Sequence, residues 1–233
     1  MNHVSTNDWH ISHFVLIRVV MATAAEPERS TLEGGASPGK APRTARGRET
    51  LRRLMDAAAL EFGERGFHEA SISGITRRAG TALGSFYTYF DSKDAIFAAL
   101  VRHMSQSVAQ AAAASVSAGS TGIRREREAL AGFLGFAREN KELYRIIDEA
   151  EFADPGNYRA HYEGTAARIA ARFDEGVKAG VIAPGDNEIR AWAVMGMNVF
   201  LGLRFGVWAE DRLIDDVGAV AEALLTDGLG TRS

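Results

Sequence analysis

The apolar residues between positions 48 and 100 recur three or four residues apart, which is the spacing of amphipathic helices. A first helix is predicted over residues 48–63, ended by Gly66-Phe67, and a second lies between the cap Ser71 and Gly80. A third, short helix begins near Leu83. The apolar sides of the three helices comprise Leu51, Leu54, Met55, Ala58, Phe62, Ile72, Ile75, Ala79, Leu83, Phe86, Tyr87 and Phe90. Two short helices folded about a glycine predict a helix-turn-helix unit.

The third helix of this unit leaves a small, polar face outward. That face carries Gly84, Ser85, Thr88 and the hydroxyl of Tyr87. The major groove of B-DNA is about 12 Å wide and admits one helix, so a helix with such a face can enter it. The pattern therefore predicts binding to double-stranded DNA.

From Ala79 to Asp94 the chain reads A-G-x-x-x-G-S-F-Y-x-Y-F-x-S-K-D, which resembles the signature of the TetR (tetracycline-repressor-like) transcriptional regulators. The resemblance covers about residues 48–100, and Thr81, Ala82 and Leu83 depart from the residues usual in the family. It implies an N-terminal three-helix domain with a helix-turn-helix, followed by a larger helical domain for ligand binding and dimerisation. The function implied is a ligand-responsive repressor, released from a palindromic operator by a small-molecule effector.

Several residues of the first domain are candidates for DNA contact. The resemblance implies phosphate contacts from Ser73, Tyr87 and Lys93, and Lys93 also follows a helix cap, where backbone N–H groups favour a phosphate. Leu83 either packs in the core or touches a thymine methyl group. The full set of candidates is Arg46, Arg48, Ser71, Ser73, Thr81, Leu83, Gly84, Ser85, Tyr87, Thr88 and Lys93.

Charge is distributed unevenly along the chain, whose net charge is -3. Residues 41–94 hold nine basic and seven acidic residues, net +2, whereas the residues from Ala95 onward hold fifteen and nineteen, net -4. A basic head on an acidic body suits a DNA-binding domain. Arg43, Arg46 and Arg48 precede the predicted first helix, where they form either an arm that reaches phosphates or the minor groove, or a solvated linker.

Helical signals continue from Ala95 to Leu229 without strand-like alternation, so the predicted fold class is all-α. One long helix is expected to run from the head to an interruption at residues 118–122, and another between Asp154-Pro155 and Gly180. The predicted domains are a disordered extension over residues 1–40, a DNA-binding domain over 41–94 and an effector-binding and dimerisation domain over 95–230.

The segment from Trp192 to Trp208 is apolar on all sides, which indicates burial against both its own domain and a partner subunit. Gly202 and Gly206, four residues apart, would let another helix approach closely. A membrane span is the weaker interpretation, because the segment is short and contains Asn198 and Arg204. The resemblance likewise implies a homodimer formed by the last two long helices.

The resemblance also implies an effector pocket inside the helical body, lined by aromatic residues. The same aromatics, at helical spacing, can equally be plain core. Arg204 either pairs with a buried acid at the dimer seam or meets the carboxylate of an acidic ligand. The candidates for ligand binding are Phe136, Tyr144, Tyr158, Tyr162, Trp192, Phe200 and Arg204.

Composition narrows the remaining possibilities. The chain contains no cysteine, which excludes disulfides and thiolate metal sites and suits a cytoplasmic protein. No cofactor, metal site or catalytic residue is predicted: Gly35 to Gly39 matches G-x-S-x-G, but no strand and helix patterns flank it. Met21 is an alternative start of the chain.

Two alternatives to a ligand-responsive repressor remain. One is a DNA-binding activator or architectural protein without a small-molecule ligand. The other is an enzyme of the helical body, with His161 or Tyr162 as catalysts, although no nucleophile, base and orienting group are assembled in the sequence.

Overall fold

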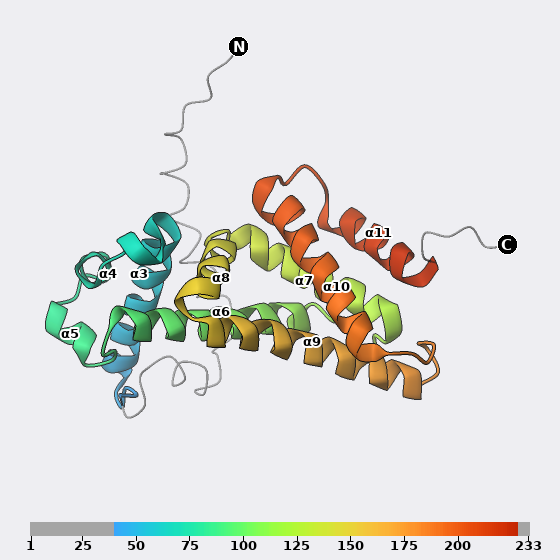
Figure 1. Ribbon diagram of the computed structural model, residues 1–233, viewed down its shortest axis with the longest axis horizontal. Helices are drawn as coiled ribbons and strands as arrows, with labels where there is room; N and C mark the ends of the chain where they lie inside the picture. Colours follow the sequence, from blue (N-terminus) through green and yellow to red (C-terminus); the bar gives the residue numbers. More distant parts are fainter. Residues whose placement is uncertain (1–39, 228–233) are drawn as a thin grey trace, which may run out of the picture.

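The computed structural model describes residues 40–227, apart from the side chain of Leu143. The predictions made for residues 1–39, namely disorder, the accidental G-x-S-x-G pattern and the alternative start at Met21, lie outside this range. All regular structure in the described range is helical, which confirms the predicted all-α class (Figure 1). The elements are α3 (Ala45–Glu69), α4 (Ile72–Ala79), α5 (Leu83–Tyr87), α6 (Lys93–Ala114), α7 (Gly122–Glu139), α8 (Glu142–Ala153), α9 (Pro155–Lys178), α10 (Asn187–Gly202), the π-helical segment η1 (Leu203–Trp208) and α11 (Ile214–Asp227).

The first helix begins earlier than the apolar pattern indicated. The Thr44 side chain accepts a hydrogen bond from the Gly47 backbone N–H and caps α3, so the helix starts at Ala45 instead of residue 48. Near the predicted end, Gly66 has a φ of 79°, which interrupts the helical geometry before a last turn to Glu69. Arg46 and Arg48 therefore lie in the first turn of α3, and the extended arm predicted for them is wrong.

A single hydrophobic core joins the head, made of α3 to α5, to the body. Its fully buried side chains include Phe62 of α3, Phe86 of α5, Phe97 of α6 and Ile146 of α8. The helix α6 leaves the head and runs along the body, with α8 packed across α3 (Figure 1). Because the core continues past residue 94, a displacement of α6 or α8 moves atoms that the head packs against.

The rest of the body consists of α9 packed on α10, and α7 packed on α11. The caps predicted for α9 are present: Asp154 accepts from the Asn157 N–H at the start, and Gly180, at a φ of 72°, follows the end.

Gly202 and Gly206 let other helices approach closely, as predicted, and those helices belong to this chain. A Cβ added to Gly202 would clash with the Tyr144 hydroxyl and the Phe133 ring, and one added to Gly206 would lie 3.1 Å from Ala137 Cβ. The two glycines thus allow α10 and η1 to pack closely on α7 and α8.

Candidate nucleic-acid interface and interior cavity

The helix α5 lies at the outer edge of the head (Figure 1). Leu83 and Tyr87 are 52% and 48% exposed, although both are large and partly apolar. A Cβ added to Gly84 would meet nothing within 4 Å, so the backbone there is open to close approach from outside. The buried Phe86 anchors the opposite side of the helix. The outward face predicted for the groove-binding helix therefore lies at the surface, with Gly84, Tyr87 and Thr88 exposed and Ser85 half-buried.

The turn between α4 and α5 depends on Gly80, which ends α4 in the left-handed conformation at a φ of 60°. At the other end of α4, the Ser71 hydroxyl accepts from the Gly74 N–H and acts as the helix cap. The exposed Ser73 in the first turn leaves its hydroxyl near the surface, whereas the Thr81 hydroxyl is buried without a hydrogen-bond partner in the described structure. Of these hydroxyl residues, Ser73 has the most open position for a phosphate contact.

A buried ionic network fixes α4 against α3. The Glu61 carboxylate is almost fully buried and accepts from Arg78 Nε at 2.6 Å, and Arg78 also pairs with Glu64. A Cβ added to Gly74 would clash with this carboxylate, so α4 can approach α3 only because a glycine stands there. Breaking one partner of a buried pair is strongly destabilising. This network therefore sets the angle at which α5 is presented.

Lys93 makes contacts within the chain that were not predicted. Its ammonium donates hydrogen bonds to the carbonyl oxygens of Phe67 at 2.7 Å, His68 at 3.1 Å and Ala70 at 3.1 Å. It also lies 4.6 Å from the centroid of the Phe67 ring. An ammonium group has three N–H donors, and three carbonyls take them up. In this arrangement Lys93 holds the end of α3 to the start of α6, and its predicted phosphate contact stays a prediction.

The helix α8 holds the same end of α3 from another side. Glu149 accepts a hydrogen bond from the Phe67 N–H, and Arg145 Nη1 donates to the carbonyl oxygens of Gly63 at 2.9 Å and Glu64 at 3.1 Å. These contacts use backbone groups that the kink at Gly66 leaves without helical partners. Residues 63–70 of α3, called here the α3 end segment, are thus held by both α6 and α8.

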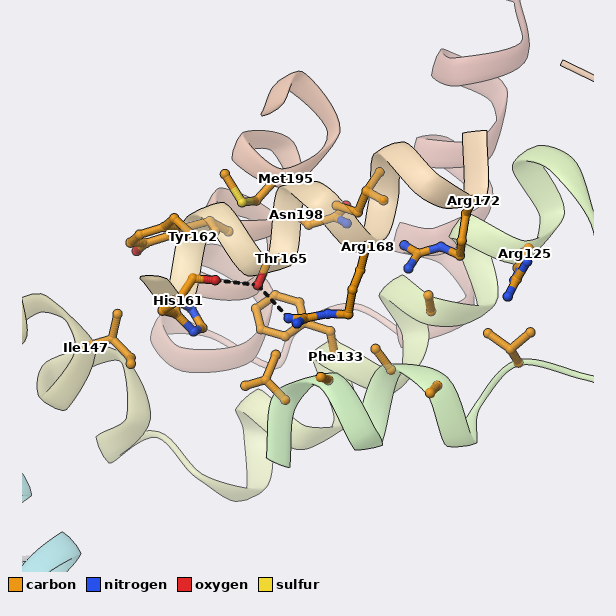
Figure 2. A pocket seen from close by; sticks show the side chains of 18 of the residues that line it. Arg125, Phe133, Ile147, His161, Tyr162, Thr165, Arg168, Arg172, Met195 and Asn198 are labelled. Atoms are coloured by element: carbon orange, nitrogen blue, oxygen red, sulfur yellow. Dashed lines mark hydrogen bonds between the residues drawn. The ribbon is translucent and has the colours of Figure 1, made fainter. Parts of the chain in front are cut away.

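The body encloses a cavity of about 290 Å³ between α6, α7, α8, α9 and α10 (Figure 2). This volume lies at the lower end of the range for small-molecule sites, roughly 300–1,000 Å³. Most of its wall is apolar, and three arginines contribute to one part of it. The residues that line it are Val108, Ala109, Ala112, Ala113, Val116, Arg125, Ala129, Phe133, Tyr144, Ile147, Asp148, His161, Tyr162, Thr165, Arg168, Ile169, Arg172, Met195, Asn198 and Val199.

Of the seven residues predicted to bind ligand, Tyr144 and Tyr162 line this cavity. Phe136 and Tyr158 instead pack against the main core, and Trp192 and Phe200 are 43% and 71% exposed on α10. Helical spacing placed these aromatics on helices but could not say which of them face the same space.

Arg204 does not line the cavity either. Its guanidinium pairs with both carboxylate oxygens of Asp211, at 3.1 and 3.2 Å, and both side chains are substantially exposed. This is an ion pair within one chain and at its surface. Arg204 thus pairs with an acid as predicted, although with an exposed one, and its place at a dimer seam stays a prediction.

The polar part of the cavity wall was not predicted from the sequence. Burial and the neighbouring Arg168 lower the pKa of His161 to about 4, so its imidazole is neutral at pH 7. His161 Nδ1 lies 2.8 Å from the Ser105 hydroxyl. Burial also raises the pKa of Tyr144 and Tyr162, and the nearby Asp148 carboxylate adds to both shifts. At pH 7 the imidazole and the two tyrosine hydroxyls are therefore neutral, and the Asp148 carboxylate lies at the same end of the cavity.

Comparison with known proteins agrees with this geometry. The family model described as bacterial regulatory proteins, tetR family, matches residues 54–100, which span most of the head and the start of α6. The HTH-type transcriptional regulator YdgC of Bacillus subtilis (strain 168) is 54% identical over 56 residues, which are 24% of this chain and 29% of that protein. The chain thus matches less than a third of the length of this relative.

Solved structures extend the likeness to the body. A TetR-like transcriptional regulator from Rhodococcus sp. RHA1 has a TM-score of 0.63 at 25% identity, over 77% of this chain and 95% of that one. The regulator FadR from Bacillus subtilis, solved in complex with stearoyl-CoA, has a TM-score of 0.67 at 18% identity, over 77% and 99% of the two chains. The head matches the tetR family model by sequence and the body resembles TetR-like regulators by fold, and together these findings support a TetR family transcriptional regulator.

Proposed function

We propose that the chain is a ligand-responsive transcriptional repressor that binds a palindromic DNA operator as a homodimer and leaves it when a small molecule fills the interior cavity. The observation that carries this proposal is the exposed face of α5, with Leu83 and Tyr87 outward beside the open backbone of Gly84. Exposed apolar side chains lack the favourable free energy of burial, and contact with a groove of DNA would bury them. The relatives named above are regulators, and the same role in the cytoplasm is proposed for this chain.

A second copy of the chain is the proposed partner of α10, η1 and α11. Large apolar side chains stand exposed on these elements, among them Trp192, Phe200, Trp208 and Val220 at 43%, 71%, 70% and 72%. Trp192 and Phe200 are eight residues apart and so share a face of α10. Residues 187–208 are long and apolar enough to cross a membrane, but their inner side packs on α7 and α9. A pair of identical faces closes into a two-fold dimer, which matches a palindromic operator.

The cavity and the head share two helices, which gives the proposed effector a route to DNA. The helices α6 and α8 both line the cavity, and both hold the α3 end segment, through Lys93 on α6 and through Arg145 and Glu149 on α8. A ligand that fits only one arrangement of α6 and α8 shifts the head toward that arrangement. Coupling of about 1–3 kcal/mol between two sites changes DNA affinity roughly 5- to 150-fold.

The full-length protein tests this proposal through selection of binding sites from a random pool of double-stranded DNA. The expected result is an enriched near-palindrome, bound by a dimer in sedimentation analysis. Binding should weaken steeply with salt, because phosphate contacts release counterions. Recovery of no enriched sequence, or of a site without two-fold symmetry bound by a monomer, contradicts the proposal.

A matched pair of substitutions isolates the dimer face. Phe200→Glu places a charge on the exposed face of α10, whereas Phe152→Glu places one on α8 at a phenylalanine that is 83% exposed. We expect Phe200→Glu to give monomers and to lose the palindromic site, while Phe152→Glu remains dimeric. Dissociation by both variants, or by neither, would argue against a dimer through α10.

A further inference from the structure

The side chains that α6 presents to the cavity are small. Ala109, Ala112 and Ala113 recur at the i, i+3 and i+4 positions and line the cavity together with Val108. Ile169 on α9 and Met195 on α10 add aliphatic surface to the same wall. Such a wall offers contact to an aliphatic chain but no hydrogen bonds along its length.

One of the three arginines in the wall has no carboxylate partner among residues 40–227. Arg172 donates two hydrogen bonds to the buried Glu126, at 2.6 and 2.7 Å, and Arg125 pairs with Glu175 at 2.8 Å. Arg168 makes no ion pair with any described residue, and its Nη2 donates to the Thr165 hydroxyl at 3.0 Å. Figure 2 shows Arg168 between Thr165 and Arg172. Loss of water around Arg168, together with the charge of Arg172, lowers its pKa, which is the cost of holding a cation there uncompensated.

Thr165 fixes the direction of this guanidinium. Its hydroxyl donates to the His161 carbonyl oxygen at 2.8 Å and accepts from Arg168, so the two bonds form a chain along the inner side of α9 (Figure 2). A guanidinium has five N–H donors, and the bond to Thr165 uses one of them. The remaining donors can bind both oxygens of a carboxylate.

We propose that the effector is an amphipathic monoanion, an aliphatic chain that ends in a carboxylate, with the carboxylate on Arg168 and the chain along Ala109, Ala112 and Ala113. This rests on the proposed function and adds the chemical class of its ligand. The opposite orientation is disfavoured because Asp148 stands at the tyrosine end, where its charge already raises the pKa of Tyr144 and Tyr162. A carboxylate placed there would meet a like charge.

Octanoate and 1-octanol are the probes, because they share the aliphatic chain and differ in the charged end. Binding of each to the full-length protein is measured by titration calorimetry at pH 7.5. We expect octanoate to bind at least about tenfold more tightly than 1-octanol, since a contact between charged groups adds to the shared apolar burial. Equal binding of the two, or tighter binding of the alcohol, would overturn the proposal.

Substitutions then locate the charged end. Arg168→Gln should weaken octanoate binding about 10- to 100-fold and leave 1-octanol within about twofold, whereas Arg168→Lys, which keeps the charge without the planar fork, should fall between. The matched control is Arg159→Gln, because Arg159 lies on the same helix, is 79% exposed and is absent from the cavity wall. An equal loss in the Arg159 and Arg168 variants, or no loss in either, overturns the assignment.

A cavity-filling change locates the chain. Ala112→Leu puts a branched side chain into the space above α6 and should abolish binding of both probes, while the melting temperature without ligand shows that the variant is folded. Retained binding would place the ligand elsewhere and overturn the proposal. Selection of a palindromic DNA site is measured without any ligand. If octanoate does not bind, the proposed DNA-binding function is therefore unaffected. If no DNA site is selected, that result does not depend on the probes.

Discussion

Lys93 has two candidate roles in the head, holding the α3 end segment or binding a DNA phosphate, and the substitution Lys93→Met distinguishes them. Methionine keeps an unbranched apolar stem beside the Phe67 ring and removes the ammonium that donates to the carbonyls of Phe67, His68 and Ala70. If Lys93 holds the α3 end segment, the change lowers the stability of the fold. If Lys93 binds phosphate, the substitution lowers the affinity for DNA and the dependence of that affinity on salt.

The magnitude follows from the three lost hydrogen bonds. A hydrogen bond to a charged group contributes about 1.5–3 kcal/mol when buried, but Lys93 is only partly buried and water can replace the ammonium at the His68 carbonyl. We therefore expect a loss of about 2–3 kcal/mol in the free energy of unfolding. For a chain of this size that corresponds to a fall of roughly 4–12 °C in melting temperature.

The assay compares urea and thermal unfolding at one fixed protein concentration, because dissociation of a dimer would also move the transition. Lys178→Met is the control, since Lys178 is an exposed lysine in the last turn of α9 and its loss should cost less than about 0.5 kcal/mol. DNA binding is then measured over a range of salt concentrations, well below the melting temperature of each variant. Each phosphate contact adds about 0.9 to the slope of log affinity against log salt. We expect that slope to be unchanged by Lys93→Met. An unchanged stability together with a slope reduced by about 0.9 would refute the structural role and restore the phosphate contact.

Three further changes test other parts of the head. Gly74→Ala should destabilise the fold by at least about 2 kcal/mol in chemical unfolding, because the added methyl group displaces the buried Glu61 carboxylate. Gly84→Ala is its counterpart: the added methyl group meets nothing within 4 Å, so stability should be unchanged or slightly higher while titration with selected DNA shows weaker binding. Asp56→Asn tests burial, which raises the pKa of Asp56 to about 6 against the opposing charge of Arg52. The folded state then binds more protons than the unfolded state between about pH 4 and pH 6, so ionisation of Asp56 destabilises the fold above pH 6. The variant should gain about 1–2 kcal/mol at pH 7.5, and melting curves should show this gain vanish as the pH falls through that window.

The sequence predicted the head well because its signals are local. Apolar spacing, the cap at Ser71 and the left-handed turn at Gly80 each depend on neighbours within four residues, and all three are present in the structure. The contacts of Lys93 within the chain were not predicted, because its partners are carbonyls some 25 residues earlier in the chain. Backbone acceptors have no letter in a sequence, so only the fold reveals such a contact.

The cavity was harder to predict for a related reason. Aromatic residues were expected to line it, yet large side chains fill space, and a cavity forms where small ones leave space empty. The three alanines of α6 at helical spacing were the available signal, together with Arg168 next to the buried Ile169 on α9. A run of alanines also suits two helices that pack tightly together. Only the packing of α9 and α10 therefore distinguishes a cavity from a close helix contact.

The contacts on the α3 end segment explain how one small ligand could control a rigid head. All of them reach backbone groups of residues 63–70, from Lys93 on α6 and from Arg145 and Glu149 on α8. Each contact ends on the main chain of the segment, so a displacement of α6 or α8 acts through these side chains on the backbone of α3. The buried pair of Glu61 and Arg78 ties α4 to α3, so the head moves with its end segment as one piece. A small change in the distance between α6 and α8 at the cavity is therefore expected to turn α5 as a unit, and in a symmetric dimer it would do so at both half-sites at once.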